Sequence, residues 1–277
     1  MPSPWIEVPD DWLDDEYSSH PGYKAFQEYF GLKVKPGVVN EYLLGEGICP
    51  AAPIEIERFS AKEISGALKI EGVMKVTGPL KLGGKGTDSI KIHRTIDNNK
   101  KMCKFDLMSA SKVRIEGFGV EYYCRVIPLL RKLGIETIKT DPTTTAEHSK
   151  ERYNLIGAYV WSFYGYSNDT MAETLNQYVD WLKKVKRINL SQALENNKRN
   201  MPRMFNLARD KINGEDTGKK FLMGLDANDK PTRSVWWSGT HHDINDESAK
   251  NEEMTELIKH LLRKIRKIDL LSYIRYN

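Results

Sequence analysis

The chain has 277 residues and a mass of 31.8 kDa, with 40% hydrophobic and 29% charged residues. This length is sufficient for one large domain or two smaller ones with a buried core. The formal net charge of +4 and the isoelectric point of about 8.7 would tolerate an anionic ligand, but they are too mild to identify a class of partner.

Membrane and disulfide-rich classes are not indicated. No apolar run approaches the roughly 20 residues that a membrane-spanning helix needs. The opening MPSPWIEVPDDWLDDEY is acidic, whereas a secretory signal peptide is basic and then apolar. The three cysteines, Cys49, Cys103 and Cys124, are odd in number and lack C-x-x-C spacing. We therefore expect a cytoplasmic protein without a metal, whose cysteines are reduced and mostly buried.

The first half of the chain begins with an irregular lead-in containing one predicted helix, Gly22 to Phe30, which Gly31 ends. Short strand-like runs follow, separated by turn residues. Strands are expected over 54–59, 67–77, 89–96 and 101–108, with a broad turn over GPLKLGGKGTD between the second and the third. The segment Asp97 to Asn99 tolerates left-handed backbone angles, so it predicts a β-hairpin between the last two strands.

A helix is predicted directly after the stretch RIEGFG, Arg114 to Gly119. Apolar residues recur at helical spacing at Val120, Tyr123, Ile127 and Leu130. Gly134 is expected to cap this helix, and a short strand is expected over IETIKT, Ile135 to Thr140. Pro128 lies inside the predicted helix, where proline costs about 3 kcal/mol, so we expect the helix to bend.

The second half is predicted to be mainly helical. A polar loop over 141–154 precedes the aromatic segment 154–167, which is read as a helix with a turn at Gly165. An amphipathic helix is expected over 171–187, with Ala172, Leu175, Val179 and Leu182 as its apolar stripe. The remaining predictions are a helix over 191–212, short strands or buried loops over 221–225 and 233–239, and a helix from 252. This order of elements predicts an α+β or mixed α/β fold.

The glycines of RIEGFG lie where a phosphate-binding loop would need them. Such a loop requires unobstructed backbone N–H groups at a helix N-terminus, whose partial positive charge favours an anion. The pattern R/Q-x-x-G-x-G/A is weak by itself, because about 0.3 matches are expected by chance in a chain of this length. Its position between a hairpin and a helix strengthens it. A simple turn is the competing interpretation.

This arrangement resembles the GCN5-related N-acetyltransferase (GNAT) fold, in which a Q/R-x-x-G-x-G/A loop holds the pyrophosphate of coenzyme A. Arg114, Gly117 and Gly119 match that loop, and LLRKLGIETIKTD is similar to the helix end and strand that follow it. GAYVWSFYGYS looks like the family's G-x-Y-x-W-x-x-x-G-F/Y segment, with matches at Gly157, Tyr159, Trp161, Gly165 and Tyr166. The resemblance covers residues 89–167.

The resemblance implies a central twisted mixed sheet flanked by helices, and transfer of an acetyl group from acetyl-coenzyme A to the amine of a small-molecule or protein acceptor. It implies a lead-in over 1–52, an acyltransferase domain over 53–240 and a C-terminal helix over 241–277. In the family, two parallel strands splay apart beside the loop and the thioester lies between them. The pantetheine arm would contact the amides of Met108, Ser109 and Ala110, and the pyrophosphate would contact Arg114, Gly117, Phe118, Gly119 and Val120.

The acid and the base of this chemistry are assigned through the same resemblance. An amine must be neutral to attack, and the thiolate leaving group gains from a general acid. A tyrosine of the aromatic segment would be that acid, Tyr159 as first choice and Tyr164 as second, although aromatic residues there equally fit a packed core. The base stays open among Asp106, Glu116, His93 and a water relay. Glu116 must also turn away from the phosphates.

Two further clusters have structural interpretations. His241, His242 and Asp243 look like a metal or catalytic cluster, but neighbours on a strand point to opposite faces, so a polar loop is expected. The basic residues of the last helix predict a solvated face: Lys259, Arg263, Lys264, Arg266 and Lys267. Two other functions stay open, a GNAT-like scaffold without catalysis and nucleic-acid binding through this helix and Lys183, Lys184, Lys186 and Arg187.

Overall fold

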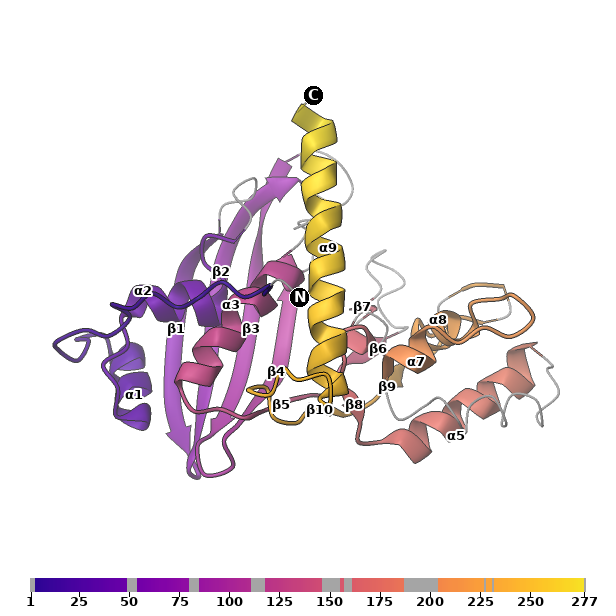
Figure 1. Ribbon diagram of the computed structural model, residues 1–277, viewed down its shortest axis with the longest axis horizontal. Coiled ribbons are helices and arrows are strands. Elements are labelled where there is room, and N and C mark those ends of the chain that lie inside the picture. The colour runs from indigo at the N-terminus through magenta and orange to yellow at the C-terminus, as the bar shows by residue number, and fades with distance from the viewer. Residues whose placement is uncertain are drawn as a thin grey trace. The chain divides into compact units, whose positions relative to one another are not determined.

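The computed structural model describes residues 3–48, 54–79, 85–110, 118–145, 155–156, 161–186, 204–226, 228–230 and 232–276. Its contacts divide the chain into two compact units. Unit 1 consists of Met1–Ile138, Asp243–Asn245 and Leu261–Asn277, and unit 2 of Lys139–His242 and Asp246–His260. Helices and strands occur in both units (Figure 1), which confirms the predicted α+β class. The domain boundaries implied by the resemblance stay a prediction.

Unit 1 contains an antiparallel sheet of β1 (Ile54–Ile64), β2 (Ala67–Pro79), β3 (Lys85–Asp97) and β4 (Met102–Ala110), paired in sequence order. All four strands were predicted, although each is longer than its prediction. The hairpin is confirmed, because Asp97 pairs with Met102. The broad turn was drawn too wide, since Gly78 pairs with Gly86 and the strands continue to Pro79 and from Lys85.

The strand β5 (Thr137–Thr140) makes the sheet mixed. It is the neighbour of β4 in the sheet, and the Thr137 N–H donates to the carbonyl of Lys101 at 3.0 Å. The start of β5 therefore lies beside the start of β4, so the two strands run in the same direction. Parallel neighbours need a crossover connection, and α3 (Phe118–Lys132) supplies it.

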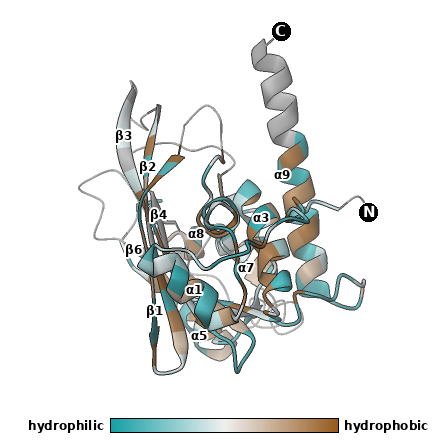
Figure 2. Cartoon of the chain, turned by 90° about the vertical axis from the view of Figure 1, so that its left-hand side faces the viewer, coloured by the Kyte–Doolittle hydropathy of each residue, from teal (hydrophilic) through white to brown (hydrophobic). Residues whose placement is uncertain are grey.

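One face of the unit 1 sheet is buried and the other is exposed, because successive strand residues alternate between the faces. The buried face carries Leu68, Ile70, Met74, Val76, Ile90, Ile92, Ile96, Cys103 and Phe105. The exposed face carries Lys69, Glu71, Lys75, Lys91 and Asp106. In Figure 2 the helices α1 and α3 both lie on one side of β1 and β2.

Helices of unit 1 cover this apolar face. α1 (Pro21–Phe30) stacks Tyr23 on Phe59 of β1 with ring centroids 4.4 Å apart. α3 places Tyr122 and Tyr123 against Phe105 of β4, at 6.2 and 5.8 Å between ring centroids. The helix ends of α1 and α3 match the prediction, with Gly31 and Gly134 in left-handed conformations.

The lead-in is more regular than the sequence indicated. α2 (Pro36–Val38) and the π-helix η1 (Val39–Leu44) follow α1. In η1, Tyr42, Leu43 and Leu44 are buried, with exposures of 3% or less. The prediction of an irregular segment here was wrong because η1 is too short to produce a recognisable helical period.

α3 runs through Pro128 without interruption, from Phe118 to Lys132. A proline at this position has no N–H for the carbonyl of Cys124, four residues earlier. The Cys124 oxygen instead accepts the N–H of Ile6 at 2.9 Å. The N-terminal segment thus satisfies the carbonyl that the proline leaves open, which explains how an interior proline is accommodated here.

Unit 2 combines short strands with short helices. β6 (Thr143–Thr145) pairs antiparallel with β7 (Leu155–Ile156) and β9 (Val235–Trp236), and β8 (Ser167–Asn168) pairs with β10 (Gly239–His241). The helical elements are α5 (Met171–Trp181), its π-helical continuation η3 (Leu182–Lys186), α7 (Met204–Ala208) and α8 (Thr217–Leu222). α9 (Glu252–Tyr276) begins in this unit and enters unit 1 at Leu261.

Predictions of element type in unit 2 were partly wrong. The polar segment 141–154 contains β6, and the aromatic segment predicted as a helix contains the strand β7, although its residues Trp161 and Ser162 are helical. The segment 221–225 was predicted as a strand or buried loop, but Phe221 and Leu222 end the helix α8. The helix expected to reach residue 212 ends at Ala208. The amphipathic helix, the turn at Gly165, a short strand within 233–239 (β9) and the C-terminal helix are confirmed.

The buried stripe of α5 agrees with the predicted one at Val179 and Leu182, which are buried, and differs from it elsewhere. Ala172 is exposed and Leu175 is half-buried, whereas Thr174, Tyr178 and Trp181 are buried. Tyr178 and Trp181 contact Phe221 of α8 at 5.0 and 6.0 Å between ring centroids. The helix is rotated toward its aromatic side because large rings bury more apolar surface than alanine does.

Candidate functional site

The predicted pyrophosphate loop lies only partly within the described residues. Arg114, Glu116 and Gly117 of the loop, and the first-choice acid Tyr159, lie outside them. The strand that leads into the loop is described to Ala110, and the helix that follows it is described from Phe118. Helix α3 is described from Phe118, inside RIEGFG, whereas the sequence predicted a helix directly after this stretch. Phosphate binding there stays a prediction.

The first turn of α3 directs its apolar side chains inward. Phe118 and Val120 are each 7% exposed, and the Phe118 ring stacks on Tyr122 with centroids 5.8 Å apart. Gly119 between them is half-buried and carries no side chain. The first N–H groups of a helix have no partner within it and form the positive end of its dipole. Gly119 therefore leaves this part of α3 without a bulky side chain beside its backbone.

A bulge interrupts β4 just before the predicted pantetheine-binding residues. Arg94 of β3 stands opposite Phe105, while the preceding His93 stands opposite Leu107, so Asp106 is the extra residue. Bulges disrupt the ladder locally and are over-represented next to active sites. Beyond the bulge, Met108, Ser109 and Ala110 pair with Ile92, Lys91 and Ile90.

Two of the candidate bases lie on the exposed face of the sheet. The Asp106 carboxylate accepts a hydrogen bond from Thr95 Oγ1 at 2.6 Å and lies 3.5 Å from Lys104 Nζ. The half-buried His93 stands opposite Glu71 on β2. The structure thus brings Asp106 and His93 together at the bulge, with Asp106 already engaged by its neighbours.

Arg94, which the sequence analysis missed, is buried directly beside the bulge, with 1% exposure. Its Nη1 donates to the carbonyl of His93 at 2.7 Å, and its Nη2 and Nε donate to Tyr122 Oη at 2.9 and 3.2 Å. Its guanidinium carbon lies 4.1 Å from the ring centroid of Phe105. The signal was present in the alternation of β3, because Arg94 occupies a position in the buried row of isoleucines.

Tyr122 extends this network from α3 to η1. It is fully buried, and its Oη donates to the carbonyl of Leu43 at 3.0 Å. Burial raises the pKa of Tyr122, while the neighbouring charge of Arg94 acts in the opposite direction. Because the phenol keeps its proton, it can donate to Leu43 and accept from Arg94 at the same time.

Tyr164, the second-choice acid, belongs to unit 2 and is 6% exposed. Its ring centroid lies 4.9 Å from that of His260, and its carbonyl oxygen lies 2.6 Å from His241 Nε2. His241 is fully buried at the end of β10, so the expected polar loop begins only at His242. Within the described parts of the chain, no group of three or more His, Cys, Asp or Glu side chains could hold a metal ion.

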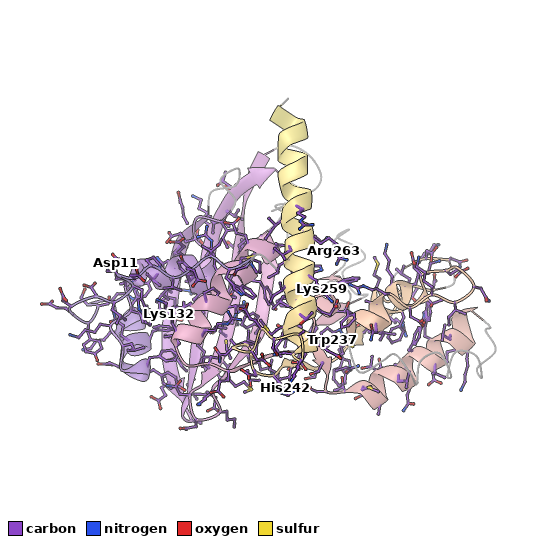
Figure 3. The ribbon with its side chains drawn as sticks, in the orientation of Figure 1. Asp11, Lys132, Trp237, His242, Lys259 and Arg263 are labelled. Carbon is purple, nitrogen blue, oxygen red and sulfur yellow. The ribbon has the colours of Figure 1, made fainter. Side chains whose placement is uncertain are left out.

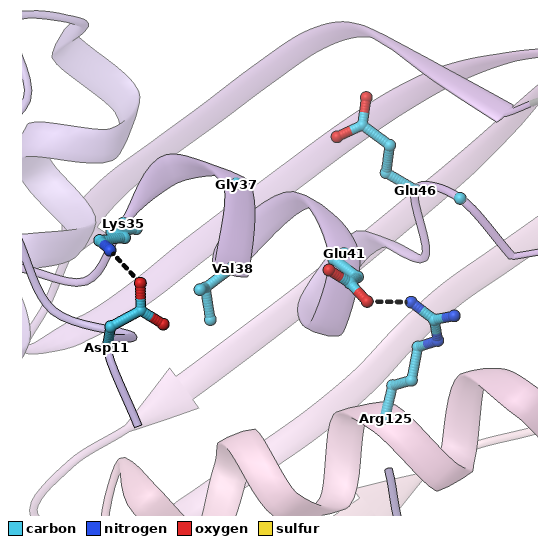
Figure 4. Close-up of a pocket in the computed structure, with 8 residues that line it drawn as sticks. Asp11, Lys35, Gly37, Val38, Glu41, Glu46 and Arg125 are labelled. Carbon is cyan, nitrogen blue, oxygen red and sulfur yellow. Dashed lines mark hydrogen bonds and ion pairs between the residues drawn. The ribbon is translucent and has the colours of Figure 1, made fainter. Parts of the chain in front are cut away.

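A pocket of about 660 Å³ opens in unit 1 beside α3 (Figure 4). Lys35 in its wall pairs with Asp11 at 2.7 Å, and Arg125 pairs with Glu41 and, at 2.8 Å, with Glu121. Both cations of the pocket are therefore neutralised by carboxylates of the same unit. This charge balance makes the pocket a poor place for the phosphates of coenzyme A.

The basic face of α9 is confirmed where its side chains are described. Lys259 and Arg263 project from the helix (Figure 3), and Lys264 and Arg266 are exposed as well. Lys259 Nζ lies 3.0 Å from Glu256 Oε1 one turn earlier. No helix among the described residues has the length and hydropathy required to cross a bilayer.

Comparisons with known proteins gave no match. A scan of protein-family models returned none, and neither did the searches of curated proteins and of solved structures. Any functional assignment therefore depends on the motifs of this chain and on the geometry of β4, α3 and β5.

Proposed function

We propose that this chain is a GNAT-type N-acetyltransferase that transfers the acetyl group of acetyl-coenzyme A to the amine of an acceptor. The observation that supports the proposal best is the order of four consecutive segments: β4, the RIEGFG loop, α3 and β5. β5 runs parallel to β4, and α3 is described from Phe118, the residue after Gly117. This is the strand, helix and strand order around the loop that the family resemblance implies.

Two regions of the described residues support the proposal that the chain binds coenzyme A. The part of α3 from Phe118 to Val120 would offer backbone N–H groups and the positive end of a helix dipole to the pyrophosphate. The bulge at Asp106 disturbs the ladder beside Met108, Ser109 and Ala110, where the pantetheine arm would lie. Coenzyme A would supply the thioester, and the chain would hold it and orient the acceptor.

The chemistry requires one proton to leave the amine and one to reach the sulfur. The neutral amine attacks the thioester carbon, and a carbon–nitrogen bond forms as the carbon–sulfur bond breaks. A backbone amide of β4 would stabilise the oxyanion that develops on the carbonyl. Tyr159 would protonate the thiolate, and Asp106, His93, Glu116 or a water molecule would accept the proton of the amine. A cytoplasmic location agrees with this proposal.

The experiment that tests the proposal is a calorimetric titration of the purified chain with coenzyme A. Gly119→Asp places a carboxylate in the first turn of α3, where it favours the helix dipole but opposes a bound phosphate. It should therefore leave folding intact and weaken binding of coenzyme A at least tenfold, about 1.4 kcal/mol. Gly117→Asp should act in the same direction.

A matched control is Gly37→Asp in the same unit, because a side chain at Gly37 meets nothing within 4 Å. It should leave the affinity unchanged. Absence of coenzyme A binding by the parent chain would remove the proposal. Binding without acetyl transfer to any member of an amine panel would favour the non-catalytic scaffold, and binding of RNA or DNA that weakens steeply with salt would favour the nucleic-acid alternative.

A further inference from the structure

We propose that Arg94 is a positioning residue, which fixes the bulge of β4 relative to the first two turns of α3. The inference rests on the proposed function for its ligand, because these two regions would hold the two halves of coenzyme A. Its structural part depends only on contacts within unit 1.

Arg94 contacts each element that the two regions depend on. On the strand side, it donates to the carbonyl of His93 at the register shift and stacks on Phe105, the residue before the bulge. On the helix side, two of its nitrogens donate to the Tyr122 hydroxyl. A planar guanidinium presents its donors in a rigid fork. These contacts therefore also restrict the orientation of α3 relative to β4.

Tyr122 carries this restraint to the start of α3. It lies one turn after Phe118, and the two rings stack at 5.8 Å between centroids. Its hydroxyl also donates to Leu43, which anchors the same point to η1. The contacts therefore run from Phe105, beside the bulge, to the helix turn that would bind the pyrophosphate.

Stability alone does not explain an arginine at this position. The same row of β3 is filled by Ile90, Ile92 and Ile96, each fully buried. Burying a guanidinium is expensive unless its donors are satisfied, and replacing buried charged groups by apolar ones is often neutral or stabilising. What the arginine adds over a fourth isoleucine is a directional link between strand and helix.

The first experiment compares Tyr122→Phe and Arg94→Met with the parent for three ligands: coenzyme A, pantetheine and ADP. A positioning role predicts that coenzyme A binds about tenfold more weakly to both variants. Pantetheine and ADP should each keep their affinity within about twofold, because each half-site stays intact. Equal losses for the whole ligand and for a fragment would overturn the inference, since they would indicate damage within one half-site.

The second experiment needs no ligand. In Tyr122→Phe, amide hydrogen exchange should accelerate by about tenfold both at Phe105 to Leu107 around the bulge and at the start of α3. The control Tyr42→Phe removes a hydroxyl that donates to Glu7 at 2.8 Å in the same unit. It should leave exchange at the bulge and the affinity for coenzyme A unchanged.

These two readouts separate the inference from the proposed function. Faster exchange confined to α3, with the bulge unaffected, would overturn the positioning role of Arg94. If the parent chain fails to bind coenzyme A, the proposed function falls, and the exchange measurement still decides whether Arg94 couples the bulge to the helix.

Discussion

The accommodation of Pro128 by the N-terminal segment gives a quantitative prediction. A variant that begins at Glu7 lacks the Ile6 N–H, so the Cys124 carbonyl loses its partner. An unsatisfied buried carbonyl costs about 1–3 kcal/mol. In a Pro128→Ala background, residue 128 supplies its own N–H to Cys124, and this cost disappears. Truncation should therefore lower the free energy of unfolding by about 1–3 kcal/mol less in the Pro128→Ala background than in the parent.

The four proteins form a double-mutant cycle, in which other losses caused by truncation, such as the Trp5 ring beside Arg131, cancel between the two backgrounds. Hydrogen exchange at the buried amides of β2 and β3 reads the stability of unit 1 itself. An equal cost of truncation in both backgrounds, within about 0.5 kcal/mol, would refute the claim that Ile6 compensates for Pro128.

Three further predictions concern buried groups. Burial raises the pKa of Cys103 and of Cys124 to about 12, so at pH 8 both thiols should resist iodoacetamide until the chain unfolds, as mass spectrometry of labelled peptides would reveal. Gly165→Ala should destabilise unit 2 by more than about 2 kcal/mol in thermal denaturation, because the new Cβ would lie 2.4 Å from the Glu253 carbonyl oxygen. As a comparison, Gly134→Ala should cost about 1 kcal/mol, because Gly134 has a positive φ but its new Cβ would meet no other atom within 4 Å. Tyr164→Phe should change acetyl transfer by less than about twofold, and a tenfold loss would move the acid role from Tyr159 to Tyr164.

The strands of unit 1 were predictable because their alternation is clean. Apolar residues on β2 and β3 recur at every second position, and the helix pattern after Gly119 is equally regular. The apolar periodicity, the turn residues and the glycine caps together predict the order of β1 to β4, α3 and β5. Unit 2 was less predictable, since its strands have two or three residues and its α7 and α8 have five and six, too few to show a period.

The bulge at Asp106 could not be predicted from the sequence. Uninterrupted pairing would have placed Leu107 opposite the buried Ile92, and the apolar Leu107 fits that position well by pattern alone. The bulge instead puts Met108 there. Leu107 and Met108 are both apolar, so the sequence does not show which of them lies opposite Ile92. Only the backbone pairing in the structure shows this.

Three features of unit 1 that depart from local sequence rules lie next to one another. They are the π-helix η1, the bulge of β4 and the buried charge of Arg94, and hydrogen bonds through Tyr122 connect η1 to Arg94. π-helical turns and bulges both occur frequently at functional sites, where local rules give way to the geometry of a site. The Phe118 ring also stacks on Tyr122, so these hydrogen bonds adjoin the part of α3 where the proposed function places the pyrophosphate.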